Sequence, residues 1–129
     1  MNKIIVEVSI GELLDKISIL EIKQDKIKDP EKLKFISNEH SILKNQQENN
    51  VKSDDKLNQL FQSLKEINAK LWIIEDEKRQ CEKDKDFGEK FIKLSRDVHF
   101  LNDDRAKIKL EINNHTGSVI KEIKEYTSY

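Results

Sequence analysis

Residues 68–79 read N-A-K-L-W-I-I-E-D-E-K-R, and they join an apolar helical series to a polar stripe that holds the only tryptophan of the chain. The apolar series starts upstream and recurs at coiled-coil spacing, which predicts a long helix over about residues 54–83. Its members are Leu57, Leu60, Leu64, Ile67, Leu71 and Ile74. The polar stripe follows at spacings of four, three and four residues, so its side chains share one face beside the apolar series. They are Asn68, Trp72, Glu75 and Arg79.

A second long apolar series predicts a helix over about residues 87–114, antiparallel to the first. Its apolar members are Phe87, Phe91, Leu94, Val98, Leu101, Ile108 and Ile112. One position inside this series is occupied by Arg105. A guanidinium at a core position costs stability unless a carboxylate meets it. We therefore predict that Arg105 pairs with Glu75 or Asp76 of the preceding long helix.

The N-terminal part of the chain predicts a short strand followed by a helix. Apolar and polar residues alternate over residues 4–8, which is the pattern of a short strand, either paired with its copy in a dimer or simply extended. Ser9-Ile10-Gly11-Glu12 is a capping box, in which the hydroxyl accepts an amide proton from the first turn and the carboxylate of Glu12 reaches back to the cap. A first helix therefore begins there and runs to about residue 28.

Turn signals divide the rest of the chain. Asp29-Pro30 predicts a helix start, because Asp caps and Pro at the first helical position loses no hydrogen bond; this second helix runs to about residue 45. Residues 46–55 lack periodicity and are predicted to form a mobile loop. Gly117 ends the second long helix, and residues 118–126 predict one short final helix.

Composition bounds the architecture. The 129 residues suit one domain over residues 1–129, but only 36% of them are hydrophobic, which is little material for a core. We predict a single all-α domain, a bundle of four main helices with the antiparallel long pair at its centre. We also expect a homodimer, because a second copy would bury apolar surface that one small core leaves exposed.

Charge and cysteine content restrict the partners and the compartment. The 24 basic and 25 acidic residues leave a net charge of −1, so we expect neither nucleic acid nor a membrane as partner. No apolar run approaches the roughly 18 residues of a membrane-spanning helix, and the N-terminus carries charge inside its apolar run, unlike a signal peptide. The one cysteine, Cys81, forms no internal disulfide. We therefore expect a cytoplasmic protein.

Arginine is rare in this chain and clustered. Three of the 24 basic residues are arginine, the other 21 are lysine, and all three arginines lie within residues 79–105. A guanidinium grips a carboxylate or a phosphate with two parallel hydrogen bonds, which an ammonium does not. The clustering therefore predicts a polar cavity between the two long helices that holds a small anionic ligand. The candidate residues are Asn68, Trp72, Glu75, Asp76, Arg79, Arg96, His99, Asn102, Asp103, Arg105 and Lys109.

Two interpretations of this cluster stay open. In the first, the arginines clamp an anion, Trp72 stacks on a ring, and His99 or a carboxylate moves a proton. In the second, the charges form a buried ion-pair network that sets the helix register, and Trp72 is a core residue. Structural networks bury charge as readily as binding sites do, and they are the more frequent case.

No metal or cofactor is predicted. Glu12 and Asp15 resemble half of a magnesium site, which needs a second acidic pair on a facing helix. The best second pair, Glu75 and Asp76, is adjacent in sequence and so points to different helix faces. The three histidines lie on separate predicted elements, none with a second His or Cys at ligand spacing, so no zinc site is predicted.

Four segments of the chain resemble an uncharacterised family of small helical proteins from bacteria and tailed phages. The segments are V-E-V-S-I-G-E-L-L-D-K-I-S-I-L-E-I-K (6–23), N-A-K-L-W-I-I-E-D-E-K-R (68–79), F-I-K-L-S-R-D-V-H-F-L-N-D-D-R-A-K-I-K-L-E-I-N (91–113) and G-S-V-I-K-E-I-K-E-Y (117–126). This resemblance covers nearly the whole chain and implies a domain of unknown function, without any chemistry.

The tryptophan segment followed by N-D-x-R-A is also similar to a second uncharacterised helical family, which tends to sit beside glycan and lipopolysaccharide glycosyltransferases. This similarity implies only that context. His99 stands where the pattern usually has tyrosine, which argues against a catalytic role for it. The matching residues are Glu12, Asp15, Lys16, Glu21, Lys23, Asn68, Trp72, Glu75, Asp76, Arg79, Arg96, Asn102, Asp103, Arg105, Lys109 and Asn113.

Three functions follow as hypotheses. The leading one is a non-enzymatic binding or accessory protein for a small anionic ligand, because the cluster lacks a metal set or an activated nucleophile. The second is a small all-α enzyme acting on an anionic metabolite by electrostatic clamping, linked to glycan or lipopolysaccharide metabolism. The third is a purely structural or interaction protein.

Overall fold

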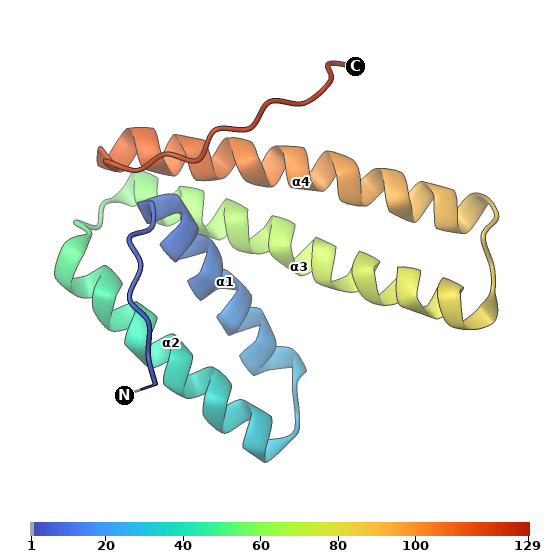
Figure 1. Cartoon of the computed structure of the whole chain (residues 1–129), viewed down its shortest axis with the longest axis horizontal. Helices are drawn as coiled ribbons and strands as arrows, with labels where there is room; N and C mark the ends of the chain where they lie inside the picture. The colour runs from blue at the N-terminus through green and yellow to red at the C-terminus, as the bar shows by residue number, and fades with distance from the viewer. Residues whose placement is uncertain (1) are drawn as a thin grey trace.

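The computed structural model describes residues 2–129, and its regular structure is entirely helical (Figure 1). The helices are α1 (Ile10–Lys26), α2 (Pro30–Asn50), α3 (Asp55–Asp84) and α4 (Glu89–Thr116). The long helices α3 and α4 lie antiparallel, α1 packs across both of them, and α2 approaches α1 alone. This arrangement confirms the predicted all-α bundle with a long antiparallel pair. None of the described helices has the length and unbroken apolar character needed to span a membrane.

Local side-chain caps begin the first three helices. Ser9 Oγ accepts a hydrogen bond from the Glu12 amide at 3.0 Å, and Asp54 Oδ1 accepts one from the Leu57 amide at 2.8 Å. Asp29 caps α2 in the same way, with proline at its first position. These starts match the predicted ones within a residue or two, because a cap satisfies amides only a few positions away.

The predicted loop over residues 46–55 is too long. Helix α2 continues to Asn50, so only residues 51–54 connect it to α3. The stretch contains no glycine or proline, and its glutamines and glutamate are good helix formers. The Asn50 side-chain amide also donates to the Gln46 carbonyl at 2.9 Å, which supports the last turn.

The final short helix predicted over residues 118–126 does not form, and the N-terminal segment is extended but unpaired. Residues 2–8 are extended but pair with no other strand of the described chain, and Ile4 is 91% exposed. A lone strand has no ladder to stabilise it. At the other end, Gly117 takes a left-handed conformation with φ 68° and ends α4. The Ser118 hydroxyl then accepts from the Ile10 amide at 3.1 Å and donates to the Ile120 carbonyl at 2.7 Å, which holds the chain out of a helix.

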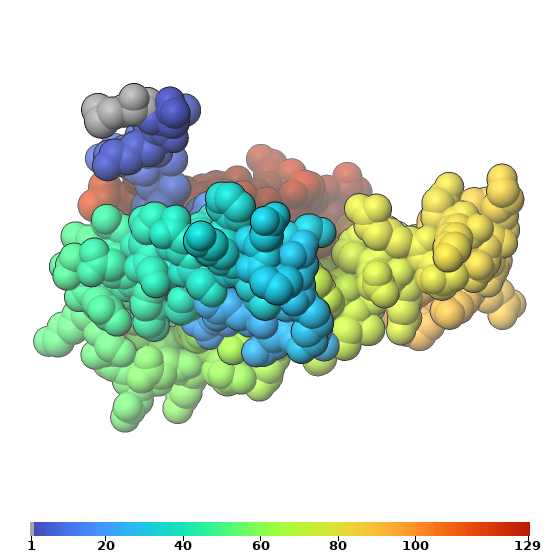
Figure 2. Space-filling view, turned by 90° about the horizontal axis from the view of Figure 1, so that it is seen from below, coloured from blue at the N-terminus to red at the C-terminus, as the bar shows by residue number. Residues whose placement is uncertain are grey.

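The hydrophobic core lies where α1, the start of α3 and the end of α4 meet. Its fully buried members are Leu14, Ile17, Leu57, Leu64 and Ile112. The predicted apolar series of α3 and α4 supply the last three of these. The far ends of both helices extend beyond α1 and α2 as a projecting hairpin (Figure 2), so core burial is concentrated at one end of the long pair.

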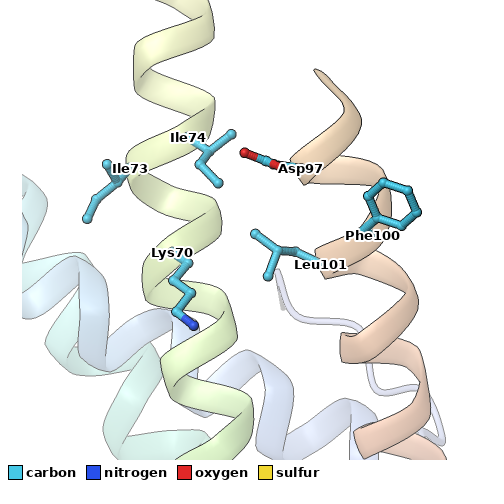
Figure 3. Close-up of a pocket in the computed structure, with 6 residues that line it drawn as sticks. All are labelled: Lys70, Ile73, Ile74, Asp97, Phe100 and Leu101. Carbon is cyan, nitrogen blue, oxygen red and sulfur yellow. The ribbon is translucent and has the colours of Figure 1, made fainter. Parts of the chain in front are cut away.

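The projecting hairpin carries an open apolar groove of about 390 Å³ between α3 and α4 (Figure 3). Ile74 and Leu101 point toward one another between the two helices, and Ile73 and Phe100 lie on the outer flanks. Ile73 is 49% exposed and Phe100 is 42% exposed. The apolar pattern of the long pair therefore continues past the region that α1 covers.

Glu21 ties α1 to both α2 and α3, and its charge should make folding pH-dependent. Its carboxylate lies 3.1 Å from His40 Nε2 and 3.1 Å from Lys65 Nζ. Burial alone raises the pKa of Glu21, but the hydrogen bonds from His40 and Lys65 outweigh it and the pKa falls below its usual 4.5. A lowered pKa stabilises the fold above about pH 4.5, and this stabilisation is lost as the pH drops through the folded-state pKa.

We predict that Glu21→Gln lowers the free energy of unfolding at neutral pH by roughly 0.5 kcal/mol, a small value because solvent screens this half-buried group. The variant should also lose less stability than the wild type between neutral pH and pH 3. Urea unfolding at several pH values measures both effects. Glu48→Gln, an exposed position on α2, is the control. Parallel stability curves for Glu21→Gln and the wild type would contradict the prediction.

Candidate functional site

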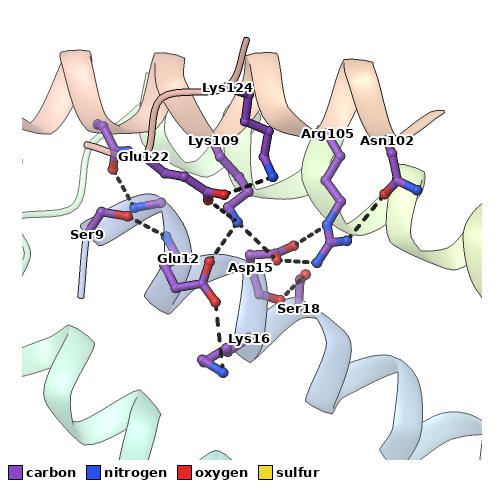
Figure 4. A network of polar contacts seen from close by, with 12 residues as sticks. Ser9, Glu12, Asp15, Lys16, Ser18, Asn102, Arg105, Lys109, Glu122 and Lys124 are labelled. Carbon is purple, nitrogen blue, oxygen red and sulfur yellow. Dashed lines mark hydrogen bonds and ion pairs between the residues drawn. The ribbon is translucent and has the colours of Figure 1, made fainter. Parts of the chain in front are cut away.

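A buried carboxylate on α1 is the centre of the polar contacts between helices. Asp15 is 2% exposed and accepts hydrogen bonds from Arg105 Nε at 3.0 Å and Arg105 Nη2 at 2.5 Å (Figure 4). Asn68 Nδ2 donates to the same carboxylate at 2.8 Å and to Ser18 Oγ at 2.8 Å. Asp15 therefore joins α1 to both long helices through one guanidinium and one amide.

The predicted pairing of Arg105 with Glu75 or Asp76 is wrong. Arg105 does meet a carboxylate, as a cation at a core position requires, but the carboxylate belongs to α1. Glu75 and Asp76 remain exposed on α3. The physical reason is that α1 packs over the seam between α3 and α4, so the inner face of α4 at Arg105 is turned toward α1.

Lys109 extends this network toward the C-terminal segment. Its ammonium lies 2.7 Å from Glu12, 3.6 Å from Asp15 and 3.3 Å from Glu122. Burial lowers the pKa of Lys109, but the hydrogen bond to Glu12 and the charges of the three carboxylates outweigh burial and raise it. Lys109 is therefore charged, and the Glu12 and Asp15 carboxylates face cations of the chain itself. Within residues 2–129, no three His, Cys, Asp or Glu side chains are grouped to hold a metal ion.

The start of α1 is docked onto the end of α4. The Gly11 amide donates to Asn113 Oδ1 at 2.7 Å, and Asn113 is 1% exposed. The two helices also approach closely at Gly11, where an added Cβ would lie 2.6 Å from the Lys109 carbonyl oxygen.

The candidate residues predicted from the sequence include neither Asp15 nor Asn113. Both residues match the family pattern, and that match was the signal available for them.

A groove of about 320 Å³ opens beside the buried network, between α1, α3 and α4. We call it the Trp72 groove. Its apolar wall comes from Ile19, Ile22, Leu71 and Trp72, and its polar groups come from Asn68, Glu75, Asp76, Arg79 and Arg105. Thus six of the eleven residues predicted for the cluster line one groove, and α1 closes it on a side that the sequence did not indicate.

The remaining predicted residues lie outside this groove. Asn102 Oδ1 accepts a long hydrogen bond of 3.4 Å from Arg105 Nη1, and Lys109 belongs to the buried network. On another side of α4, the Arg96 guanidinium lies 5.7 Å from the Phe100 ring centroid. The His99 ring contacts the Phe100 ring edge-on and the Tyr129 ring at a tilt, with centroids 5.6 and 5.0 Å apart. Asp103 accepts a hydrogen bond from the Tyr129 hydroxyl.

The three arginines therefore do not meet. Arg79 and Arg105 share the Trp72 groove, whereas Arg96 lines a different surface. Nine residues separate Arg96 from Arg105, which is two and a half helical turns at 3.6 residues per turn, so the two side chains leave α4 on opposite sides. Closeness in sequence therefore did not indicate closeness in space, because helical geometry puts residues at that spacing on opposite sides of the helix.

Comparison with known proteins places the chain in a family without indicating a function. No curated protein and no solved structure matches it. The model of the Family of unknown function (DUF6165) matches residues 4–129, a span that contains the whole buried network and the Trp72 groove. The chain is therefore a member of this family of unknown function, DUF6165.

Proposed function

We propose that this protein binds a small anionic ligand in the Trp72 groove. The observation that carries the proposal is that the groove is lined by two guanidinium groups, one fixed and one free. Arg105 is held by the buried Asp15, and Arg79 has no acidic partner among residues 2–129. A guanidinium has five N–H donors, and Arg105 uses three of them on Asp15 and Asn102. The others remain for a ligand.

The charge of Arg105 supports this role. The hydrogen bond to Asp15, together with nearby carboxylates, raises the pKa of Arg105 even though burial opposes it, so the guanidinium stays charged. A side chain whose position is set by a buried carboxylate loses little conformational freedom when a ligand binds. Arg79 is exposed and would close on the anion from the other long side of the groove.

The rest of the lining restricts the ligand class. Trp72 with Ile19 and Ile22 forms an apolar wall suited to a ring, either aromatic or the apolar face of a sugar. Glu75 and Asp76 add two carboxylates to the same groove. They disfavour a ligand that is only anionic and favour one that also carries hydroxyl or ammonium donors.

Trp72 is the only tryptophan, so its fluorescence reports on this groove alone. We predict that inorganic phosphate, citrate or a uridine diphosphate sugar changes this emission on titration. Arg79→Ala should weaken binding at least about tenfold, or about 1.4 kcal/mol, with little change in stability because Arg79 is exposed. Calorimetric titration gives the affinity directly.

Arg96→Ala is the matched control for this experiment. This variant also removes one exposed guanidinium, but Arg96 lies on a surface of α4 that does not line the Trp72 groove, so binding should be unchanged. If none of the three probes binds, or if Arg79→Ala binds as tightly as the wild type, the groove is not an anion site.

A second candidate function is catalysis on the same ligand class. It is favoured by one observation, the presence of two arginines and two carboxylates in one solvent-open groove. Arginines stabilise developing negative charge and a carboxylate transfers protons. Turnover of a phosphorylated compound or a sugar nucleotide that is lost in Arg79→Ala would establish an enzyme; binding without turnover supports the accessory protein.

A further inference from the structure

The Trp72 groove is lined by a buried amide whose orientation is fixed. Asn68 is 5% exposed, and its Nδ2 donates to Asp15 Oδ1 and to Ser18 Oγ, each at 2.8 Å. The Ser18 hydroxyl gives its own hydrogen to the Asp15 carbonyl oxygen at 2.7 Å, so it accepts from the amide. A carboxylate also only accepts. The nitrogen of Asn68 therefore faces α1, and its oxygen points away from these two partners.

The side-chain oxygen of Asn68 is left free by the rest of the chain. Both N–H groups of the amide are used, but no residue among 2–129 donates to Oδ1. Every enclosed polar side-chain atom of the described residues has a hydrogen-bond partner. Oδ1 must therefore contact open space, and the space that Asn68 lines is the Trp72 groove. The groove thus holds a fixed acceptor that needs a donor from a ligand.

Arg105 places hydrogen-bond donors beside this acceptor. Its Nε donates at 3.0 Å to Asp15 Oδ1, the same oxygen that accepts from Asn68, so one atom holds the two side chains next to each other. Nη2 donates to Asp15 and Nη1 to Asn102 (Figure 4). Each of these two nitrogens keeps one further N–H. Fixed donors next to a fixed acceptor suit an anionic group that has a hydroxyl or an amine beside it.

The charge of Arg105 favours a hydroxyl over an ammonium at this position. An ammonium on Asn68 Oδ1 would lie against the guanidinium and be repelled, whereas a hydroxyl is uncharged. Glu75 and Asp76 are exposed carboxylates in the same groove. They accept hydrogen bonds from further hydroxyl groups and repel a ligand that carries only negative charge. The groove therefore offers cations for one anionic group and several acceptors for hydroxyl groups.

The apolar wall and the size of the groove fit a single sugar ring. Trp72 is half-buried and Ile22 is buried. A sugar ring lays its C–H face on such a wall while its hydroxyl groups turn toward the acceptors. At about 320 Å³ the groove is near the lower end of ligand pockets, which is about 300 Å³. This volume suits one ring with a phosphate and is small for a nucleotide sugar.

Resting on the anion binding proposed above, we propose that the ligand is a monosaccharide phosphate with a hydroxyl on the carbon next to the one that carries the phosphate. The phosphate lies between Arg105 and Arg79, and the neighbouring hydroxyl donates to Asn68 Oδ1. The ring lies on Trp72, and its other hydroxyl groups face the two carboxylates of the groove. Each polar group of the lining then has a partner of the matching kind.

Calorimetric titration with matched phosphates tests the ligand class. Glucose 1-phosphate and mannose 1-phosphate differ only in the orientation of the hydroxyl next to the phosphate-bearing carbon. At least one of them should bind at least about tenfold more tightly than inorganic phosphate. 2-Deoxyglucose 1-phosphate lacks this hydroxyl and should bind about tenfold more weakly than the tighter of the two, because Asn68 Oδ1 then has no donor. Uridine diphosphate glucose should bind no more tightly than that sugar phosphate.

Two variants connect these affinities to the groove. Trp72→Ala should weaken the sugar phosphate about tenfold and leave binding of inorganic phosphate unchanged, since only the sugar uses the apolar wall. Asn68→Ala should bind the sugar phosphate and its 2-deoxy analogue equally. Far-UV circular dichroism checks that this variant folds; if it does not, the comparison of the two ligands on the wild type decides. Phe100→Ala removes a ring outside the groove and is the control.

The results separate this inference from the proposed function. If inorganic phosphate or citrate binds but neither sugar phosphate binds more tightly than inorganic phosphate, the groove is an anion site and the monosaccharide assignment is wrong. Equal affinities of the wild type for the sugar phosphate and its 2-deoxy analogue, or tighter binding of uridine diphosphate glucose, would also overturn the assignment. If no probe binds at all, both proposals fail.

Discussion

Replacing Arg105 with alanine is expected to lower the free energy of unfolding by about 3–5 kcal/mol, because it leaves the buried Asp15 carboxylate without its bidentate partner. Asn68 at 2.8 Å and Lys109 at 3.6 Å remain near Asp15 and offset part of this loss. Since domains of this kind are stable by roughly 5–15 kcal/mol, the variant should be severely destabilised. Urea unfolding followed by far-UV circular dichroism measures the loss.

A double-mutant cycle separates a lost ion pair from lost packing. Asp15→Asn keeps the shape of the side chain but removes its charge, so Arg105→Ala should cost much less in the Asp15→Asn background than in the wild type. Arg79→Ala is the control for deleting an arginine as such, because Arg79 is exposed. If Arg105→Ala costs no more than Arg79→Ala, Asp15 does not depend on the guanidinium and the network is not what holds α1 in place.

Gly11→Ala should have an effect of similar size for a steric reason. A Cβ at this position would lie 2.6 Å from the Lys109 backbone oxygen and 2.9 Å from Asn113 Oδ1. The first atom belongs to a helix backbone and cannot rotate away, so α1 must lift from α4. We expect a loss of about 3 kcal/mol, combining overpacking with the weakened hydrogen bond from the Gly11 amide to Asn113. Thermal and urea unfolding measure the loss.

Gly88→Ala is the matched control for Gly11→Ala. A Cβ there would meet only the flexible Asp86 carboxylate at 3.4 Å, and Gly88 is exposed, so stability should hardly change. Equal stability of the two variants would mean that α1 and α4 are not in the close contact described. Because α1 also carries Ile19 and Ile22 of the Trp72 groove, Gly11→Ala should weaken binding of any probe that the groove accepts.

The helices were predictable because their signals are local. Ser9, Asp29 and Gly117 begin or end helices through contacts with residues within a few positions, and the structure confirms each of them. The errors occur where a local signal depends on distant residues. Residues 4–8 have a strand pattern but no partner strand in the described chain, and Ser118 is held by the Ile10 amide instead of starting a helix.

The candidate site was predictable only in part. Trp72, Glu75 and Arg79 share a helix face in the sequence pattern and share a groove in the structure. Arg96 was placed with Arg105 on closeness in sequence, although their spacing already puts them on opposite sides of α4. Apart from the family pattern, Asp15 suggested half of a metal pair, because a buried carboxylate on another helix cannot be matched to its cation from spacing alone.

The amino-acid sequence by itself determined the capped helices, the apolar faces of α3 and α4, and the need of Arg105 for a carboxylate, since all three follow from contacts or periodicity within one helix. Only the tertiary structure decided that Asp15 supplies this carboxylate and that α1 closes the Trp72 groove. Which helix covers a given face depends on how Leu14 and Ile17 of α1 pack against Leu64 and Ile112 of the long pair. Such packing joins residues far apart in the chain, and no local spacing encodes it.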